Sequence, residues 1–100
     1  MAETATKGRE LISSRIIEPP KFKVIFVNDD YTPMEFVIAL LISIFKHDQA
    51  SATNITMQIH HEGAGVAGIY NFEIAEQKAL DATMIARNNS HPLVIKVEEA

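Results

Sequence analysis

A strand-like segment that changes into a helix-like segment across a six-residue turn most constrains the fold of this chain. Residues 22–27, FKVIFV, alternate and then become apolar, which is typical of a buried strand. Residues 28–33, NDDYTP, have the composition of a turn, in which Thr32 could cap a helix and Pro33 could occupy its first position. Apolar residues then recur at helical spacing to about Lys46. The chain therefore needs both a sheet and helices that pack against it.

The remaining segments complete an α+β pattern. A second helix fits residues 50–61 and is ended by Gly63, which can adopt the left-handed conformation of a helix C-cap. Residues 66–72 predict a strand, residues 74–88 an amphipathic helix and residues 93–97 a last strand. We expect the order β-α-α-β-α-β, with a three-stranded antiparallel sheet packed against three helices in a single compact domain.

The beginning of the chain differs in composition from the rest. It is rich in Thr, Ser, Glu, Lys and Arg, and it ends in Glu18-Pro19-Pro20, which favours an extended backbone. We expect residues 1–20 to form a flexible N-terminal extension and residues 21–100 to form one core domain.

Charge and composition argue against several classes of function. The net charge is −4 and the nine Lys and Arg residues form no cluster, so a nucleic-acid surface is not expected. The chain has no cysteine, and no apolar run approaches the roughly 18 residues of a membrane span. We therefore expect a cytoplasmic protein without nucleic-acid or membrane partners. We also expect a monomer, because most apolar residues are assigned to the core.

Two short motifs resemble cofactor sites but lack the required context. Residues 63–68 spell GAGVAG, yet they follow a helix and lead into a strand, the reverse of a dinucleotide-binding motif. His60 and His61 are adjacent, so on a helix their side chains diverge by about 100° and cannot both face one metal ion. No serine lies in a nucleophile-elbow sequence. We expect no cofactor, no metal and no catalytic residues.

The polar turn allows two interpretations. Its Asx side chains, Asn28 to Asp30, could simply bond their own backbone. Alternatively, the two helices that follow could form an apolar hole beside the turn, with acceptors at its rim. The residues expected to share these helix faces are Met34 and Val37 on the first helix and Thr56, Ile59 and His60 on the second. Such a hole suits a ligand with one cationic and one apolar end, such as a free peptide N-terminus with a large first side chain.

Three segments carry a family resemblance: FKVIFVNDDYTPMEFVI from Phe22, IHHEGAGVAGIYNFEIAEQK from Ile59 and ARNNSHPLVIKVEE from Ala86. They resemble ClpS, the bacterial adaptor that delivers N-degron substrates to the ClpA unfoldase of the ClpAP protease. The resemblance covers about Pro20 to Glu99. It implies a fold like that of the C-terminal domain of the ribosomal stalk protein.

The resemblance also implies roles for individual residues. The α-amino group of the substrate would be held by Asn28, Asp29, Asp30 and His60. The wall of the hydrophobic pocket would consist of Phe26, Thr32, Met34, Val37, Thr56, Ile59 and Leu93. The N-terminal domain of ClpA would contact Tyr31, Glu73 and Lys78. The implied substrates begin with Phe, Leu, Tyr or Trp, and the N-terminal extension would serve the unfoldase as a handle.

Thr56 departs from the pattern of the family, in which methionine is common at this position. Threonine is shorter, β-branched and carries a hydroxyl. We therefore hypothesise a roomier pocket, with relaxed discrimination against Ile or Val or with weaker binding of the usual first residues.

A scaffold protein is the alternative to an N-degron receptor. Such a protein would use the same fold for protein-protein contacts through a helix face, without binding N-degrons. The scaffold hypothesis predicts that residues 28–30 can be altered without loss of binding to the partner.

Overall fold

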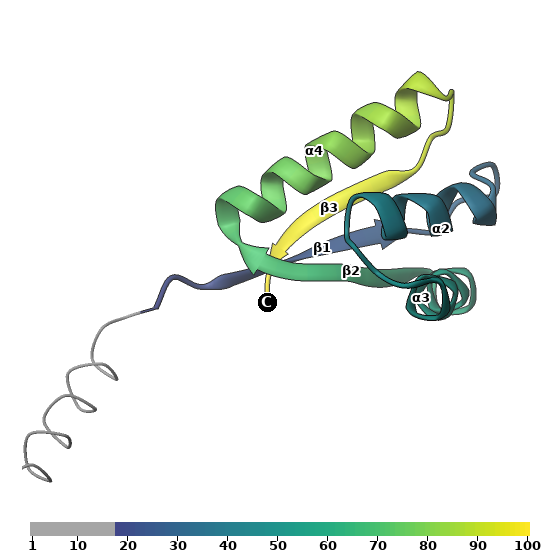
Figure 1. Cartoon of the computed structure of the whole chain (residues 1–100). Helices are drawn as coiled ribbons and strands as arrows, with labels where there is room; N and C mark the ends of the chain where they lie inside the picture. Colours follow the sequence, from purple (N-terminus) through teal and green to yellow (C-terminus); the bar gives the residue numbers. More distant parts are fainter. Residues whose placement is uncertain (1–17) are drawn as a thin grey trace, which may run out of the picture.

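The helices and strands follow one another in the order expected from the sequence. The structure, a computed structural model, describes residues 18–100 (Figure 1). Its elements are β1 (Lys21–Val27), α2 (Met34–Ser43), α3 (Gln49–Glu62), β2 (Ala64–Asn71), α4 (Phe72–Asn88) and β3 (Val94–Glu99). The predicted β-α-α-β-α-β order with three strands and three helices is confirmed. Most of the predicted extension, residues 1–17, lies outside the described part.

The central strand of the antiparallel sheet is β1, since the strand order is β2-β1-β3. Its alternation places Val24 and Phe26 on one face, where both are fully buried. The pairing with β2 shifts between Val24 and Ile25, so that Ala67 lies in a bulge. There the carbonyl oxygen of Ala67 accepts a hydrogen bond from Nε2 of His47. This bond satisfies a backbone polar group at the interruption of the ladder.

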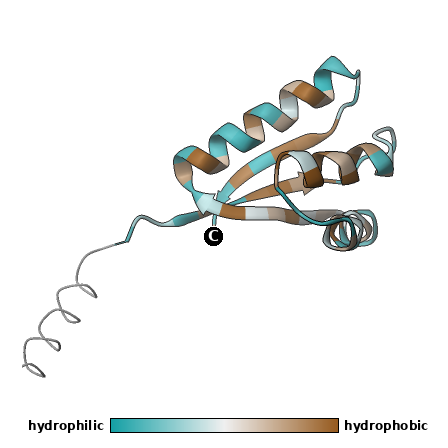
Figure 2. Ribbon diagram, in the orientation of Figure 1, coloured by the Kyte–Doolittle hydropathy of each residue, from teal (hydrophilic) through white to brown (hydrophobic). Residues whose placement is uncertain are grey.

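The helices cover one face and one end of the sheet. Figure 1 shows α4 lying along the sheet, whereas α2 and α3 gather at the end toward which β1 runs. The buried residues of α4 are Ala75, Ala79, Ala82 and Ala86. Because alanine side chains are short, α4 can approach the strands closely. Apolar bands on the strands face apolar stretches of α4 and α2 (Figure 2). In residues 18–100, no helix combines the length and apolar character needed to cross a membrane.

The first helix is shorter than predicted. It ends at Ser43 rather than near Lys46, because Lys46 adopts a left-handed backbone with a φ of 62°. The ammonium group of Lys78, on α4, donates to the carbonyl oxygen of Ile44 at 2.8 Å. This bond satisfies one of the carbonyl groups that the end of a helix leaves without a partner. The other element ends differ from the predicted ones by at most two residues.

The helix caps were predicted only in part. The prediction that Thr32 caps the first helix is wrong, because Pro33 occupies the N-cap position and makes no side-chain capping bond. The N-cap of α3 is Asp48, whose carboxylate accepts the backbone N–H of Ser51 at 2.8 Å. The predicted C-cap of α3 is confirmed, since Gly63 has a φ of 89°.

Candidate functional site

The turn after β1 is anchored to the C-terminal end of α3. The backbone N–H of Asn28 donates to the carbonyl oxygen of Gly63 at 2.9 Å. Gly63 in turn donates its own N–H to the carbonyl oxygen of Ile59, also at 2.9 Å. His60 directly follows Ile59, so it lies in the last turn of α3, before the glycine to which Asn28 bonds. The structure thus brings the polar turn and the histidine of α3 to the same end of the sheet.

Close packing of α3 on β2 supports this arrangement. Gly65 is buried and pairs with Phe26 across the sheet. A Cβ atom on Gly65 would lie only 2.8 Å from Cγ1 of Ile59. The glycine therefore allows α3 to approach the sheet at the residue that precedes His60. The sequence analysis missed this role, because the GAGVAG segment indicated only a cap and a turn.

The carboxylate of Asp29 stabilises the turn through hydrogen bonds to the two residues that follow Asp30. Its Oδ1 accepts the backbone N–H groups of Tyr31 at 2.8 Å and Thr32 at 2.7 Å. Its Oδ2 accepts the hydroxyl of Thr32 at 2.8 Å. For Asp29 the interpretation of an Asx side chain bonding its own backbone is confirmed. A carboxylate has about four acceptor positions, so about one remains for a ligand.

The pKa of Asp29 reflects these contacts. Burial raises the pKa, but the N–H groups of Thr32 and Tyr31, the Thr32 hydroxyl and the charge of His91 outweigh it and hold the pKa below the ordinary value for aspartate. The carboxylate is therefore charged at neutral pH and contributes negative potential to the turn.

Three acceptors near the turn are open to solvent. Asn28, Asp30 and His60 are all exposed. The amide oxygen, the carboxylate and the neutral imidazole can each accept a hydrogen bond. Together they offer the number of acceptors that an ammonium group with three N–H donors can use.

Most of the predicted wall residues lie in the core beneath this rim. The residues that are at least nine-tenths buried are Phe26, Val37, Thr56, Ile59 and Leu93, and the half-buried ones are Thr32 and Met34. The Phe26 ring packs edge-on against Phe45, with ring centroids 5.4 Å apart. Met34 opens α2 beside the turn, where its side chain is the more accessible part of the wall.

The hydroxyl of Thr56 is used within α3. The side chain is 3% exposed, and its Oγ1 donates to the carbonyl oxygen of Ala52, one turn earlier in α3, at 2.8 Å. A buried hydroxyl that is already satisfied has little tendency to leave its partner for a ligand. The hydroxyl noted in the sequence analysis is therefore used within the helix.

Phe36 and His91 also belong to this end of the molecule, and the sequence analysis did not select them. Their rings pack edge-on with centroids 4.4 Å apart. His91 also contributes to the lowered pKa of Asp29. For His91, the one signal available in the sequence was its position two residues before Leu93, a predicted wall residue.

The three expected unfoldase contacts do not form one small patch. Tyr31 is 79% exposed and follows the C-terminal end of β1. Glu73 lies in the first turn of α4, just after Asn71, which pairs with Lys21 at the opposite end of β1. These two ends are about 20 Å apart, given the rise of a seven-residue strand.

Lys78 has contacts within the fold. Besides its bond to Ile44, its Nζ lies 5.3 Å from the ring centroid of Tyr70 and 6.0 Å from that of Phe45. The ammonium group therefore joins α4 to the end of α2, and only part of the side chain is open to a partner.

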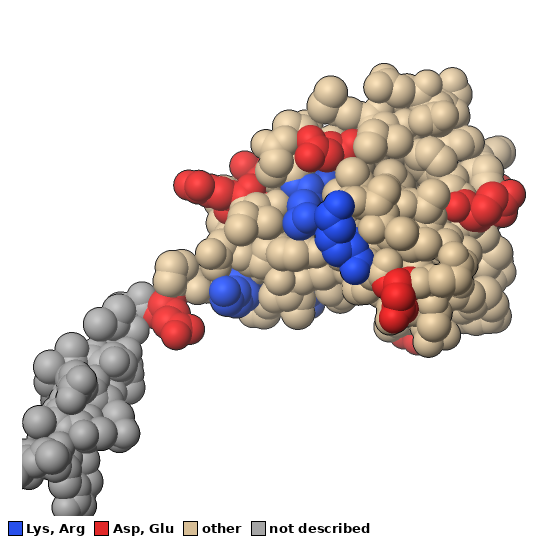
Figure 3. Space-filling model, viewed as in Figure 1, with Lys and Arg blue, Asp and Glu red and all other residues tan. Residues whose placement is uncertain are grey.

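The described residues offer no metal-binding cluster. Among residues 18–100, no group of three or more His, Cys, Asp or Glu side chains could hold a metal ion. On the face shown in Figure 3, the Lys and Arg side chains are few and are interspersed with acidic ones. This face lacks the continuous positive surface that nucleic acid needs.

Comparison with known proteins matches the chain to one family. The family model described as "ATP-dependent Clp protease adaptor protein ClpS" matches residues 17–96. The ATP-dependent Clp protease adapter protein ClpS of Shewanella piezotolerans is 50% identical over 91 residues, which cover 91% of this chain and 89% of that protein. The ClpS of Shewanella halifaxensis is 48% identical over 98 residues, covering 98% and 96%.

A solved structure has the same fold. Agrobacterium tumefaciens ClpS2 bound to L-phenylalaninamide aligns with a TM-score of 0.80 and 34% identity. The alignment covers 83% of this chain and 100% of that one.

Proposed function

Since this chain belongs to the ClpS family, the adaptor proteins of the ATP-dependent Clp protease, we propose that it binds the free α-amino group and the large hydrophobic first side chain of N-degron substrates. It is an adaptor and not an enzyme. The proposal extends to delivery of these substrates to the ClpA unfoldase, through its N-terminal domain.

The observation that carries the proposal is the bond from Asn28 to the C-cap of α3. This bond ties the turn that carries Asn28 and Asp30 to the end of the helix that carries His60. The side chains of Val37, Ile59 and Leu93 belong to the buried core cluster. An ammonium group at the rim would place the first side chain of its peptide toward this apolar cluster.

The energetics support a useful affinity. Charge-assisted hydrogen bonds to an ammonium group contribute about 1.5 to 3 kcal/mol each. Burial of a Phe or Leu side chain contributes about 1.5 to 3 kcal/mol more. After the entropy lost on association, micromolar or somewhat tighter binding is expected.

We assign the acceptor roles unequally. Asn28, Asp30 and His60 are exposed and supply the acceptors for the ammonium group. Asp29 contributes its charge and about one acceptor position, because its other positions hold the turn.

The pocket should be selective for Phe, Leu, Tyr and Trp, with an additional tolerance that Thr56 provides. A methyl group at this position occupies less space than a methionine side chain. The space would accommodate a branch on the first Cβ of the peptide, as in Ile or Val.

Among the expected contacts for the unfoldase, Tyr31 and Glu73 are exposed. Because they lie at opposite ends of β1, a partner domain would have to span both ends or use one of them. Lys78 would act mainly by fixing the helix that carries Glu73.

A peptide titration tests the proposal. Fluorescent peptides that begin with Phe, Leu, Ile, Val or Met are titrated by anisotropy at about pH 7.5, where the carboxylates are charged and most histidines are neutral. An N-acetylated Phe peptide is the control. We expect binding of the Phe and Leu peptides that acetylation abolishes, because the acetyl group removes the cationic donors.

Variants then locate the site on the molecule. Asp30→Asn and His60→Ala should each weaken binding of the Phe peptide at least about tenfold, the effect of one lost charge-assisted bond. Lys23→Ala, on β1 away from the turn, is the matched control. Absence of binding by every peptide, with the fold intact, would contradict the proposal and favour the scaffold alternative.

A further inference from the structure

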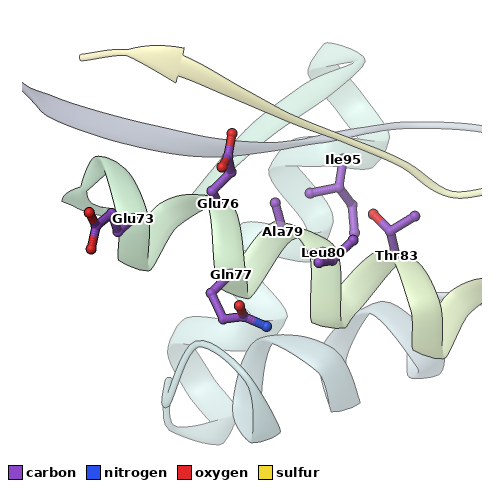
Figure 4. Close-up of a pocket in the computed structure, with 7 residues that line it drawn as sticks. All are labelled: Glu73, Glu76, Gln77, Ala79, Leu80, Thr83 and Ile95. Atoms are coloured by element: carbon purple, nitrogen blue, oxygen red, sulfur yellow. The ribbon is translucent and has the colours of Figure 1, made fainter.

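A groove runs between α4 and β3, away from the candidate site. Its volume is about 580 Å³, and its lining residues are Glu73, Glu76, Gln77, Ala79, Leu80, Thr83 and Ile95. Figure 4 shows α4 as one wall, with Ile95 reaching from β3 toward Leu80 and Ala79. Leu80 is 54% exposed, although it is a large apolar side chain. The groove therefore presents an apolar floor next to the backbone of a strand.

The strand beside this groove is an edge of the sheet. Among the described residues, β3 pairs only with β1. The backbone N–H of Ala100 donates to the carbonyl oxygen of Lys21 at 2.8 Å. This bond determines which residues of β3 direct their backbone N–H and C=O groups toward β1. Because backbone groups alternate along a strand, those of Ile95 and Val97 point away from β1. These N–H and C=O groups can form the ladder of an additional strand.

The side chains of the same two residues lie on the inner face of the sheet, and that of Ile95 lines the groove. Ile95 pairs with Phe26 and Val97 with Val24, and both partners are buried on the inner face. An added strand would therefore alternate too, with every second side chain entering the groove.

One end of the groove is acidic. Glu73 and Glu76 line it there, and Figure 4 places them at the opposite end from Thr83. The nearby cations of α4 have other partners: Lys78 bonds to Ile44, and Arg87 bonds to Leu93. An isolated negative end favours a Lys or Arg side chain of the bound segment.

From this combination we propose that the groove binds an extended segment of a partner polypeptide, which joins β3 as a fourth strand. The segment carries a branched apolar residue opposite Leu80 and a Lys or Arg two positions away, opposite Glu76. The spacings on the two sides agree. Glu76 and Leu80 are four residues apart on a helix, which corresponds to a rise of about 6 Å, and residues two positions apart in a strand are about 6.6 Å apart. This surface is separate from the proposed α-amino-group site and would act independently of it.

An acetylated peptide distinguishes this groove from the N-degron site. The probe is Ac-TKTVTKT-amide, whose sequence is symmetric, so either strand direction places a lysine two residues from the valine. It lacks a free α-amino group and cannot satisfy the rim near Asn28. The full chain is titrated with the probe and followed by amide NMR shifts. We expect saturable shifts at Ile95 and Val97 and along α4 near Leu80.

Peptide controls test the ladder and the charge. The same peptide with N-methyl groups on its valine and on the threonine that follows the valine lacks a ladder N–H in either strand direction, and it should not bind. Ac-TETVTET-amide places carboxylates against Glu76 and should not bind either. Equal binding of the N-methylated peptide would overturn the proposal, as would shifts that map away from β3 and α4.

Protein variants test the location. Leu80→Ser and Glu76→Lys should each weaken binding of the lysine probe at least about tenfold, whereas Met57→Ser should not change it. Met57 is the matched control because it is 40% exposed on α3. Failure of the probe to saturate by about 1 mM, in a sample that still binds a Phe peptide, would overturn the groove proposal alone.

Discussion

At the scale of single residues, Asp29 has the clearest structural role in the turn. Replacement by alanine removes the acceptor for two backbone N–H groups and one hydroxyl. We expect Asp29→Ala to lower the free energy of unfolding by about 1 to 3 kcal/mol, measured by urea denaturation. Asp29→Asn keeps an oxygen for the backbone N–H groups and should lose less. Equal stability of wild type and Asp29→Ala would show that water replaces these bonds at no cost.

The lowered pKa of Asp29 predicts how stability depends on pH. Although burial opposes it, the net shift in the folded state is downward because hydrogen bonds favour the charged form. The stabilisation by the charged Asp29 carboxylate is therefore complete above the ordinary pKa of a carboxyl group, about 4. It is lost as pH falls through the lower pKa of the folded state. The stability difference between wild type and Asp29→Asn should shrink below about pH 4.

The difference between the two proteins is the quantity to measure, because Asp48 also has a lowered pKa and contributes equally to both. Urea midpoints at a series of pH values give this difference. A difference that grows in acid would contradict the assignment.

Thr56 allows a prediction about selectivity. Its side chain is 3% exposed, and its hydroxyl bonds to the carbonyl oxygen of Ala52. Thr56→Met should fill the added space and weaken binding of peptides that begin with Ile or Val at least about tenfold relative to Phe peptides. Thr56→Val is the matched control, since it keeps the shape and removes only the hydroxyl. An unchanged ranking of first residues in Thr56→Met would refute the roomier pocket.

At the scale of elements, the contact between α3 and β2 depends on Gly65. An alanine Cβ would lie 2.8 Å from Cγ1 of Ile59, a buried side chain with little room to move. We expect Gly65→Ala to lower the free energy of unfolding by about 1 to 3 kcal/mol, as overpacking does. It should also weaken peptide binding, because α3 carries His60.

Gly63→Asn is the control for Gly65→Ala. At Gly63 a Cβ meets nothing within 4 Å, and asparagine tolerates a positive φ better than other residues do. Thermal denaturation and anisotropy on the same samples separate the two effects. Wild-type stability of Gly65→Ala would mean that α3 shifts without cost.

The order of the elements was predictable because each has a strong local pattern. The strand at Phe22 to Val27 and the helices show the periods of two and of about 3.6 residues that burial of one face requires. Helix ends were less predictable, since they depend on distant groups. Apolar spacing continues to Phe45, yet the helix stops at Ser43, where Lys78 from α4 binds the carbonyl of the following residue.

The site was predictable to a similar degree. Helical spacing predicted a common face for Thr56, Ile59 and His60, and the structure buries the first two and exposes the third. The hydrogen-bond partners of the polar groups could not be predicted from the spacing of residues in the sequence. The carboxylate of Asp29 turns toward its own backbone, and the separation of Tyr31 from Glu73 follows from the length of β1.

At the scale of the whole molecule, β1 connects the two ends of the fold. It is the central strand, it leads into the candidate site, and residues 18–20 precede it as an exposed segment without regular structure. Figure 1 shows this segment leaving the sheet at the end opposite to α2 and α3. An unfoldase that pulls on the N-terminal extension would therefore apply force at the end of β1 opposite to the candidate site.

This arrangement predicts different effects of the extension on binding and on delivery. Fully extended, residues 1–17 span up to roughly 60 Å, enough to reach into a pore from a docked adaptor. Deletion of these residues should leave the affinity for a Phe peptide unchanged and reduce ClpA-dependent degradation of an N-degron substrate at least about tenfold. A Gly/Ser segment of equal length should restore delivery, because a handle needs reach more than a particular sequence. Degradation at the wild-type rate by the deleted form would remove the extension from the mechanism, whereas loss of peptide binding would show that it supports the site instead.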